Sequence, residues 1–224
     1  GAPGVMADRC YGCGRCLPAC PHGLIEERSQ VLAGADVSPL LAQLRPDAVE
    51  LHTHPGRGAA FAERVGQLRA SGVQLRRLAV SAGLEGTAQS PAALGAELWL
   101  RFTLLRAAGF RPLWQLDGRP MSGDLGAGTA RAAVKLVAAL LPQTPPGPVQ
   151  LAGGTNSHTL PQLAGYPLKH HIAGVAFGGV ARRLLQPLLL EAQGRRRSLL
   201  TDAELWPRAL GLARELVDPW LERV

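Results

Sequence analysis

Four cysteines near the N-terminus have the spacing of an iron-sulfur site. They are the only cysteines in the 224 residues: Cys10, Cys13, Cys16 and Cys20. Followed by Pro21, they form C-x2-C-x2-C-x3-C-P, the bacterial ferredoxin run, whose thiolates hold the irons of a [4Fe-4S] cluster. Gly12 and Gly14 let the backbone wrap closely around such a cluster. A zinc ribbon would pair two knuckles across a longer spacer, and disulfides are not expected in a reducing compartment.

The fourth cysteine raises the question of a second cluster. In two-cluster ferredoxins, the first three cysteines of the run hold one cluster and the fourth holds the other. Either all four cysteines bind one cluster here, or Cys20 serves a second cluster whose other ligands lie outside this chain. Because residue 1 is Gly and not an initiating Met, we expect a fragment of a longer protein that holds up to two clusters.

A second group of polar residues lies in the segment QLDGRPMSGDLGAGTAR, residues 115–131. Asp117 ends a predicted strand, and Arg119, Ser122 and Asp124 follow on a glycine-rich loop. Such a loop can bring a carboxylate, a guanidinium group and a hydroxyl to one cleft, which makes Asp117 and Arg119 candidates for contact with a cofactor. The alternative is a structural role, in which an Asp cap and an Arg–Asp ion pair hold a turn.

Other polar residues also follow predicted strands. His52 and His54 share one face if the chain stays extended there. Two histidines can meet a metal or a substrate, but no third ligand is evident, so a structural role is the preferred interpretation. Asn156, which is followed by Ser157 and His158, is a further candidate for contact with a bound cofactor.

Two glycine pairs, Gly153-Gly154 and Gly178-Gly179, end the last two predicted strands. In (βα)8 barrels, the loops after strands seven and eight often hold a phosphate through backbone N–H groups, helped by a helix N-terminus. We therefore predict that these glycines contact FMN or another phosphate-bearing ligand. The alternative is that glycine pairs simply end strands at tight turns.

The elements that must position these residues recur along the chain. Strands are expected at 48–53, 76–82, 111–118, 148–154 and 171–179. Each precedes a helical segment, and a last helix over 202–223 is expected to be capped by Thr201 or Asp202. Strands that alternate with helices need a parallel sheet, because parallel neighbours are joined by crossover connections. The predicted class is α/β, with Trp99 and Trp114 in the core.

Five strand–helix units fit either a doubly wound sheet or part of a (βα)8 TIM-barrel-like domain. If the two glycine-bearing strands are the seventh and eighth, three strands lie outside this chain, which agrees with the fragment expected from the cysteines. We favour the partial barrel. The predicted domains are a ferredoxin-type iron-sulfur segment over residues 1–30 and the C-terminal part of a barrel-like domain over 31–224, with a linker that extends to Pro46.

Composition excludes several classes of function. The formal net charge of +7 comes from dispersed arginines, aromatic residues make up 4% of the chain, and Lys135 and Lys169 are the only lysines. A nucleic-acid surface would concentrate its charge and interleave aromatic residues, so nucleic-acid binding is not expected. No apolar run approaches the roughly 20 residues that span a bilayer, and no secretory signal is present. We expect a soluble, cytoplasmic protein.

Several segments taken together resemble the LdpA (light-dependent period) family of cyanobacterial iron-sulfur proteins. They are DRCYGCGRCLPACPHGLI (8–25), VELHTH (49–54), WQLDGRPMSGDLGAGTARAAVKL (114–136), VQLAGGTN (149–156) and IAGVAFGGVARRLL (172–185). The resemblance implies a longer parent protein with more strands and more cysteines ahead of this segment. It also implies that the four cysteines are cluster ligands and that the partners are circadian clock or redox proteins. It implies no catalytic residue.

The resemblance favours a redox-sensing regulatory protein, an input of photosynthetic electron-transport state to the circadian clock. In this hypothesis, a change at the cluster alters a surface that binds partners. The alternative is an iron-sulfur oxidoreductase, in which FMN lies over the paired glycines at the barrel mouth and the cluster feeds it electrons. That alternative depends on fold-level analogy.

Overall fold

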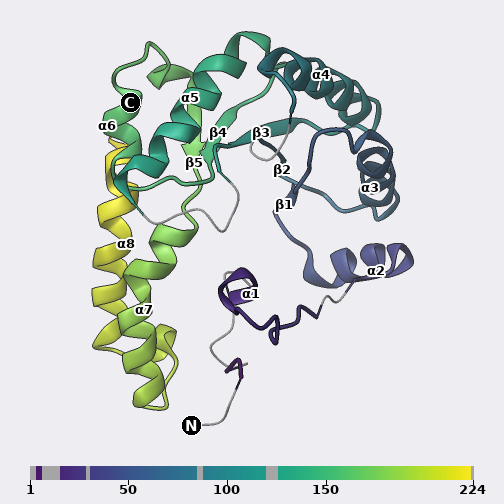
Figure 1. Ribbon diagram of the computed structural model, residues 1–224. Coiled ribbons are helices and arrows are strands. Elements are labelled where there is room, and N and C mark those ends of the chain that lie inside the picture. The colour runs from purple at the N-terminus through teal and green to yellow at the C-terminus, as the bar shows by residue number, and fades with distance from the viewer. Residues whose placement is uncertain (1–3, 7–15, 29–30, 85–87, 120–125, 223–224) are drawn as a thin grey trace.

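Five parallel strands form one sheet in the computed structural model, which describes residues 4–6, 16–28, 31–84, 88–119 and 126–222. The strands are β1 (Ala48–Leu51), β2 (Arg77–Ala82), β3 (Pro112–Asp117), β4 (Val149–Ala152) and β5 (Ile172–Val175). Their order in the sheet is the order in the chain, β1-β2-β3-β4-β5, and every pairing is parallel. The predicted α/β class and all five predicted strands are therefore confirmed (Figure 1).

Helices alternate with the strands. They are α1 (Cys16–Ala19), α2 (Gly34–Leu44), α3 (Gly58–Ala70), α4 (Pro91–Ala107), α5 (Ala130–Leu140), α6 (Thr159–Leu163), α7 (Gly179–Gly194) and α8 (Leu205–Leu221). Short 3-10 turns are η3 (Ala127–Thr129), η4 (Leu141–Gln143), η5 (Lys169–His171) and η6 (Leu199–Thr201). Helix α4 shows why such segments start where they do: the Ser90 hydroxyl accepts the Ala93 amide at 3.2 Å, and Pro91 takes the first helical position.

The main core lies on one face of the sheet. Alternate strand residues such as Val80 and Trp114 point to this face and are fully buried. Helices α3, α4 and α5 pack against them through side chains that include Phe61, Leu98 and Val137. Parallel crossovers are right-handed, so a sheet whose order follows the chain collects its connecting helices on one face. The side chains between the core residues point to the opposite face, where the polar residues described below lie.

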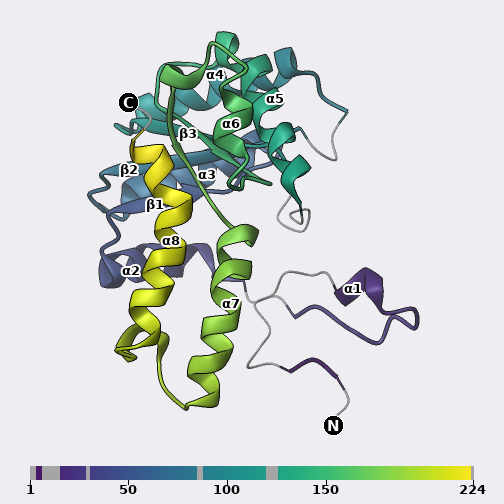
Figure 2. The same cartoon turned by 90° about the vertical axis from the view of Figure 1, so that its left-hand side faces the viewer.

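Helices α7 and α8 form a hairpin that extends from the sheet and returns to it (Figures 1 and 2). The hairpin has an apolar cluster of its own: Leu188, Ala192, Leu199, Leu205 and Ala209. Only near the end of α8 does it rejoin the main core, through Trp220. The hairpin is therefore held by contacts that are largely separate from those of the sheet.

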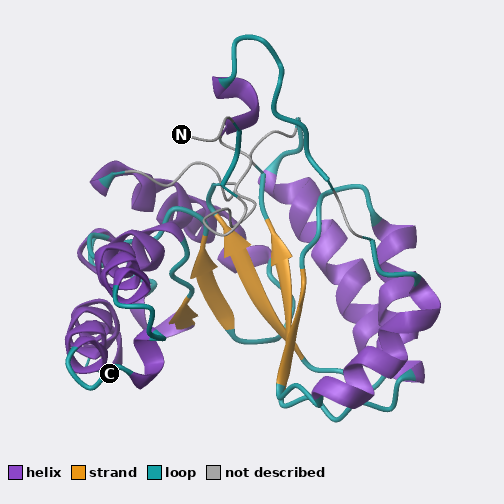
Figure 3. Ribbon diagram, turned by 90° about the horizontal axis from the view of Figure 1, so that it is seen from below, coloured by secondary structure: helices purple, strands orange, loops and turns teal. Residues whose placement is uncertain are grey.

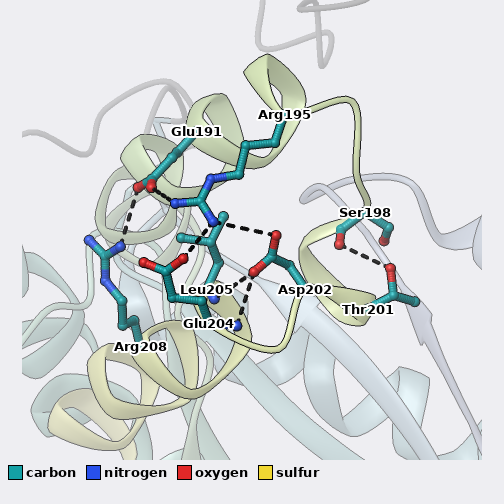
Figure 4. Close-up of polar contacts among 8 residues, drawn as sticks. All are labelled: Glu191, Arg195, Ser198, Thr201, Asp202, Glu204, Leu205 and Arg208. Carbon is teal, nitrogen blue, oxygen red and sulfur yellow. Dashed lines mark hydrogen bonds and ion pairs between the residues drawn. The ribbon is translucent and has the colours of Figure 1, made fainter.

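Polar contacts close the turn between α7 and α8 (Figure 4). The Asp202 carboxylate accepts the amides of Glu204 and Leu205, each at 3.0 Å, so the predicted cap at Asp202 is confirmed. The amide of Leu205 in particular lowers the pKa of Asp202. Arg195 pairs with Glu204 at 2.7 Å and with Glu191 at 2.5 Å, which joins the last turn of α7 to the start of α8.

Two predictions about the elements are wrong. The expected linker contains α2, whose Leu41 packs into the main core beside α3. Pro39 lies inside this helix, and tertiary packing outweighs the cost of a proline there. Trp99 is 48% exposed on α4, where its Nε1 donates to the Gln143 carbonyl oxygen at 3.0 Å, whereas Trp114 is buried as predicted. Trp99 follows the core residue Leu98 directly, and helical geometry turns it away from the sheet.

Within the described ranges, no helix combines the length and apolar character that a bilayer-spanning segment needs.

Candidate functional site

The described part of the cysteine run begins with α1. The amide of Cys20 donates to the Cys16 carbonyl oxygen at 3.1 Å, a helical hydrogen bond that places the two cysteines one turn apart. Both thiols are free and half-buried. The sulfur of Cys20 accepts the Leu24 amide at 3.4 Å, and this bond lowers the pKa of the Cys20 thiol. Free thiols on one turn, one of them with a lowered pKa, suit iron ligation.

The other two predicted ligands, Cys10 and Cys13, lie outside the described residues. The described part of the N-terminal segment, residues 16–28, stands apart from the sheet, as Figures 1 and 2 show. It lies on the side to which the strand arrowheads point (Figure 3). The carboxyl ends of the strands and α1 therefore share one side of the molecule.

A second site is built on the sheet face opposite the main core. Six residues of β1 to β4 and the first loop place polar side chains there, and we call them the polar face: Glu50, His52, Ser81, Gln115, Asp117 and Gln150. Parallel pairing brings them together, because Ser81 is the register partner of Gln115, which is in turn the partner of Gln150. Since side chains alternate along a strand, neighbours in register share a face.

A chain of hydrogen bonds crosses this face. The side-chain amide of Gln150 donates to the Gln115 oxygen at 2.8 Å, and that of Gln115 donates to Glu50 Oε1 at 2.8 Å. Gln115 also lies 3.4 Å from Asp117 Oδ1. On the other side, the Ser81 hydroxyl lies 2.8 Å from Nδ1 of His52. The polar face is thus one network that spans four strands.

Asp117 is the most perturbed carboxyl group on the polar face. Burial raises its pKa from 3.8 to about 6. The negative charge of Glu50 acts in the same direction, whereas His52 and the hydrogen bonds from Gln115 and Ser81 oppose the shift. The carboxyl group therefore gains or loses its proton close to neutral pH.

Ser81, His52 and Asp117 do not form a nucleophilic triad. In such a triad one ring nitrogen meets the serine and the other meets the carboxylate. Here the same Nδ1 of His52 faces both Ser81, at 2.8 Å, and Asp117, at 3.9 Å. The arrangement therefore does not activate the serine hydroxyl for attack.

A buried ion pair on α4 fixes the loop that carries His52 and His54. Arg101 is 1% exposed; it donates to the hydroxyl of Thr53 and to the carbonyl oxygen of His54, the latter at 2.9 Å. Its partner Glu97, one helical turn away, accepts the Gly56 amide at 3.0 Å. Burying two charges is costly unless their hydrogen bonds are made. Here the loop supplies partners for the two terminal nitrogens of Arg101 and for Glu97, whereas the buried Nε of Arg101 has no hydrogen-bond partner among the described residues.

The two histidines meet edge to face, with ring centroids 5.4 Å apart. A metal site would need further ligands. Among the residues that the structure describes, no group of three His, Cys, Asp or Glu side chains could hold a metal ion.

The glycine pairs lie at the carboxyl ends of the neighbouring strands β4 and β5. Gly153 and Gly154 have φ of 67° and 86°, which favour glycine. A Cβ on Gly153 would lie 2.4 Å from the Arg119 carbonyl oxygen, so close packing against the β3 loop accounts for this glycine. Gly178 directly precedes α7, where a Cβ would meet only the Arg182 guanidinium group at 3.8 Å.

Asn156 is 4% exposed and has a structural environment. Its amide nitrogen donates to the Gly126 carbonyl oxygen at 3.0 Å and its oxygen accepts the His158 amide at 2.9 Å. Thr129 joins the same group by donating to the Gly154 carbonyl oxygen at 2.7 Å. These contacts tie the turn before α5 to the end of β4 and leave the Asn156 side chain directed into the protein.

Arg119 lines a shallow hollow of about 470 Å³ between α4 and α5, with Lys135 and an apolar floor that includes Leu84 and Leu136. Asp117, from the same predicted group, belongs to the polar face. Ser122 and Asp124, from the same predicted loop, are not among the described residues.

Four members of the polar face escaped the sequence analysis: Glu50, Ser81, Gln115 and Gln150. Each lies inside a predicted strand, whereas the predicted site residues lie near strand ends. The signal was present as alternation, with a polar residue between apolar ones in VEL, WQL and VQL. Only the register between strands shows that these positions meet.

Comparison with known proteins agrees with both parts of the chain. Residues 1–31 match a family described as the LdpA Fe-S cluster-binding domain, and residues 40–219 match the light dependent period A C-terminal domain. The protein "Light dependent period A" of Synechococcus elongatus is 42% identical over 226 aligned residues, which cover 99% of this chain. The chain spans 62% of the length of that relative. No solved structure matches it.

The cysteine run at the N-terminus, the two matched domains and a relative of this identity lead to one assignment: the chain belongs to the light dependent period A family of proteins with an iron-sulfur cluster-binding domain.

Proposed function

We propose that this chain is part of a cytoplasmic iron-sulfur redox sensor that reports the state of photosynthetic electron transport to the circadian clock. Its partners would be clock or redox proteins that bind a surface altered by the cluster. The match of residues 1–31 to an Fe-S cluster-binding domain supports the cofactor, and the name of the Synechococcus relative supports the light-dependent role.

The observation that carries this proposal is the placement of Cys16 and Cys20. They lie one helical turn apart on a half-buried segment, within the ferredoxin spacing. We propose that Cys10, Cys13 and Cys16 bind one [4Fe-4S] cluster and that Cys20 serves a second cluster in the full-length protein. A cluster near the surface exchanges electrons readily and is open to oxidation, as a sensor requires.

We also propose that the five strand–helix units are the C-terminal part of a (βα)8 barrel. The sequential strand order supports this, because a barrel follows chain order around its circumference and keeps its helices outside. The polar face would then line the interior near the carboxyl ends of the strands, the end of the barrel at which functional groups gather.

Cysteine substitutions in the full-length protein test the ligand assignment. Cys10→Ala, Cys13→Ala or Cys16→Ala should each abolish the shared cluster, whereas Cys20→Ala should damage only the second one. The measurements are iron content, visible absorption and electron paramagnetic resonance after purification without air. His22→Gln, a change beside the run that removes no thiol, is the matched control. Full iron content in any of the first three variants would contradict the assignment.

A second experiment separates the sensor from a flavin-linked oxidoreductase. The spectrum of the full-length protein is recorded before and after chemical removal of the cluster. A sensor should leave no visible chromophore, whereas a residual flavin spectrum would support the oxidoreductase. Hydrogen exchange of the reduced and oxidised protein then tests sensing itself, because a signal needs a surface whose protection depends on the cluster. Identical exchange in both states would refute it.

A further inference from the structure

Three titratable groups converge beside the first loop of the sheet. Nδ1 of His52 lies 3.6 Å from the carboxylate of Glu50 and 3.9 Å from that of Asp117. Glu50 and Asp117 are 41% and 18% exposed, so the pair lies at the border between solvent and the sheet. Two carboxylates beside an imidazole favour its protonated form. Imidazole is also the side-chain group that ordinarily exchanges its proton close to neutral pH.

The hydrogen bonds show which side of the His52 ring faces the site. The Ser81 hydroxyl oxygen accepts the Thr53 amide at 3.1 Å and lies 2.8 Å from Nδ1 of His52. The same Nδ1 faces both carboxylates, on a side chain that is 59% exposed. Solvent thus has direct access to the site.

We propose that Glu50, His52 and Asp117 form one proton-binding site, and that proton uptake tightens the loop of residues 52–57 between β1 and α3. When His52 becomes positively charged, it is drawn to both carboxylates, which belong to the adjacent strand β1 and to β3 beyond β2. Loss of the proton removes that attraction and leaves the loop held by its other contacts alone.

The other contacts of the loop are made by a buried ion pair. On the far side of the loop, Arg101 and Glu97 pair with each other and bind the backbone of His54 and Gly56. The ring of His54 meets the His52 ring edge on and is the remaining titratable neighbour in the described loop. The loop is thus held at two ends. The end at His52 depends on the proton, and the opposite end is held by the buried ion pair.

Burial raises the pKa of Asp117 to about 6, so its carboxylate is charged at neutral pH and can attract the imidazolium form of His52. The loop is therefore held most tightly when the proton lies on His52 and both carboxylates are charged. This function goes beyond cluster-based sensing and does not depend on it.

Nuclear magnetic resonance of the His52 ring during a pH titration tests the site. Glu50→Gln and Asp117→Asn should each lower the pH midpoint of the His52 signal, because each removes a negative charge that favours the imidazolium. Asp47→Asn removes an 80% exposed carboxylate just before β1 and should leave the midpoint unchanged. Two separate carboxylate variants keep the test decisive if one of them folds poorly. An unchanged midpoint in both would overturn the shared site.

Hydrogen exchange of the Thr53 and Gly56 amides tests the effect on the loop. After correction for the intrinsic effect of pH, exchange should be slower below the midpoint by roughly two- to five-fold, the range for partly exposed charge pairs. His52→Gln should abolish this difference while the amides of β3 exchange as before. Exchange that is independent of proton uptake would overturn the link to the loop, even if the midpoint shifts are observed.

Discussion

Asp117 shows how a single residue can bind a proton at a cost to stability. Its carboxylate lies at the end of β3, where burial shields it from water and Glu50 adds a second negative charge. The hydrogen bonds from Gln115 and Ser81 compensate only in part. Buried carboxyl groups with raised pKa values cluster at functional sites, because such a group is not needed for packing alone.

The cost should be measurable as a pH dependence of stability. Since the pKa rises from 3.8 to about 6, the native state holds the proton more tightly than the unfolded state. The free energy of unfolding should therefore fall as pH rises through this window and stay lowered above it. Asp117→Asn should raise the free energy of unfolding by about 1–3 kcal/mol at neutral pH and have little effect below the window. Urea denaturation at several pH values measures this.

The exposed carboxylate of Asp47 is the matched control for that prediction. It pairs with Arg76 at 3.3 Å, and both side chains are at least 80% exposed. Such pairs contribute little, so Asp47→Asn should change the free energy of unfolding equally little at every pH. A pH profile of Asp117→Asn that is parallel to that of the unchanged protein would contradict the role assigned to Asp117.

At the scale of elements, Gly153 and Gly178 differ in how much space surrounds them, so their replacement should have different effects on stability. Gly153→Ala should destabilise the protein by about 2–4 kcal/mol, because φ is positive and the new Cβ would press on the backbone of Arg119. Gly178→Ala should cost less than about 1 kcal/mol, since its Cβ would meet only a flexible side chain. Thermal and chemical unfolding compare the two. Equal losses would show that close backbone approach is not what selects glycine at Gly153.

The elements themselves were largely predictable from the sequence. Five strands with apolar runs and intervening helices are local patterns, and each was placed within a few residues. The helix α2 was missed because Pro39 argues locally against it, while the contact of Leu41 with the core is not local. Trp99 was misplaced for the converse reason, since a large apolar residue on a helix gives no sign of which face it occupies.

The polar face marks the limit of prediction for the site. Asp117 and His52 were singled out as strand-end residues, but Ser81 and Gln115 lie within strands and look like ordinary sheet positions. Their meaning depends on register, and one residue of slippage would send every side chain to the other face. The cysteine run could be recognised because its spacing is a property of the chain alone, and its role as the set of cluster ligands is a prediction.

At the scale of the whole molecule, the described chain has three parts with different kinds of support. The sheet and its helices share one core, the hairpin of α7 and α8 has a second cluster, and α1 with the residues up to 28 stands apart from both (Figure 2). Because stability is not uniform across a structure, parts with separate contacts can open separately. A change at the cysteine segment can therefore occur without a change at the polar face.

The hairpin provides the test of this division. Its inner cluster is small, while Leu190, Trp206 and Leu210 are among several exposed apolar side chains that add nothing to it. Amides in the middle of α7 and α8 should therefore exchange through a local opening of lower free energy than amides of β2 and β3.

Asp202→Ala, which removes the acceptor of two amides at the start of α8, should lower that opening free energy further by about 1–2 kcal/mol. Arg208→Ala removes only an exposed ion pair with Glu191 and should change it by less than about 0.5 kcal/mol. Native-state hydrogen exchange resolves the two regions in one experiment. If Asp202→Ala destabilised β2 and β3 as much as the hairpin, the hairpin and the sheet would form a single cooperative unit and the division would be wrong.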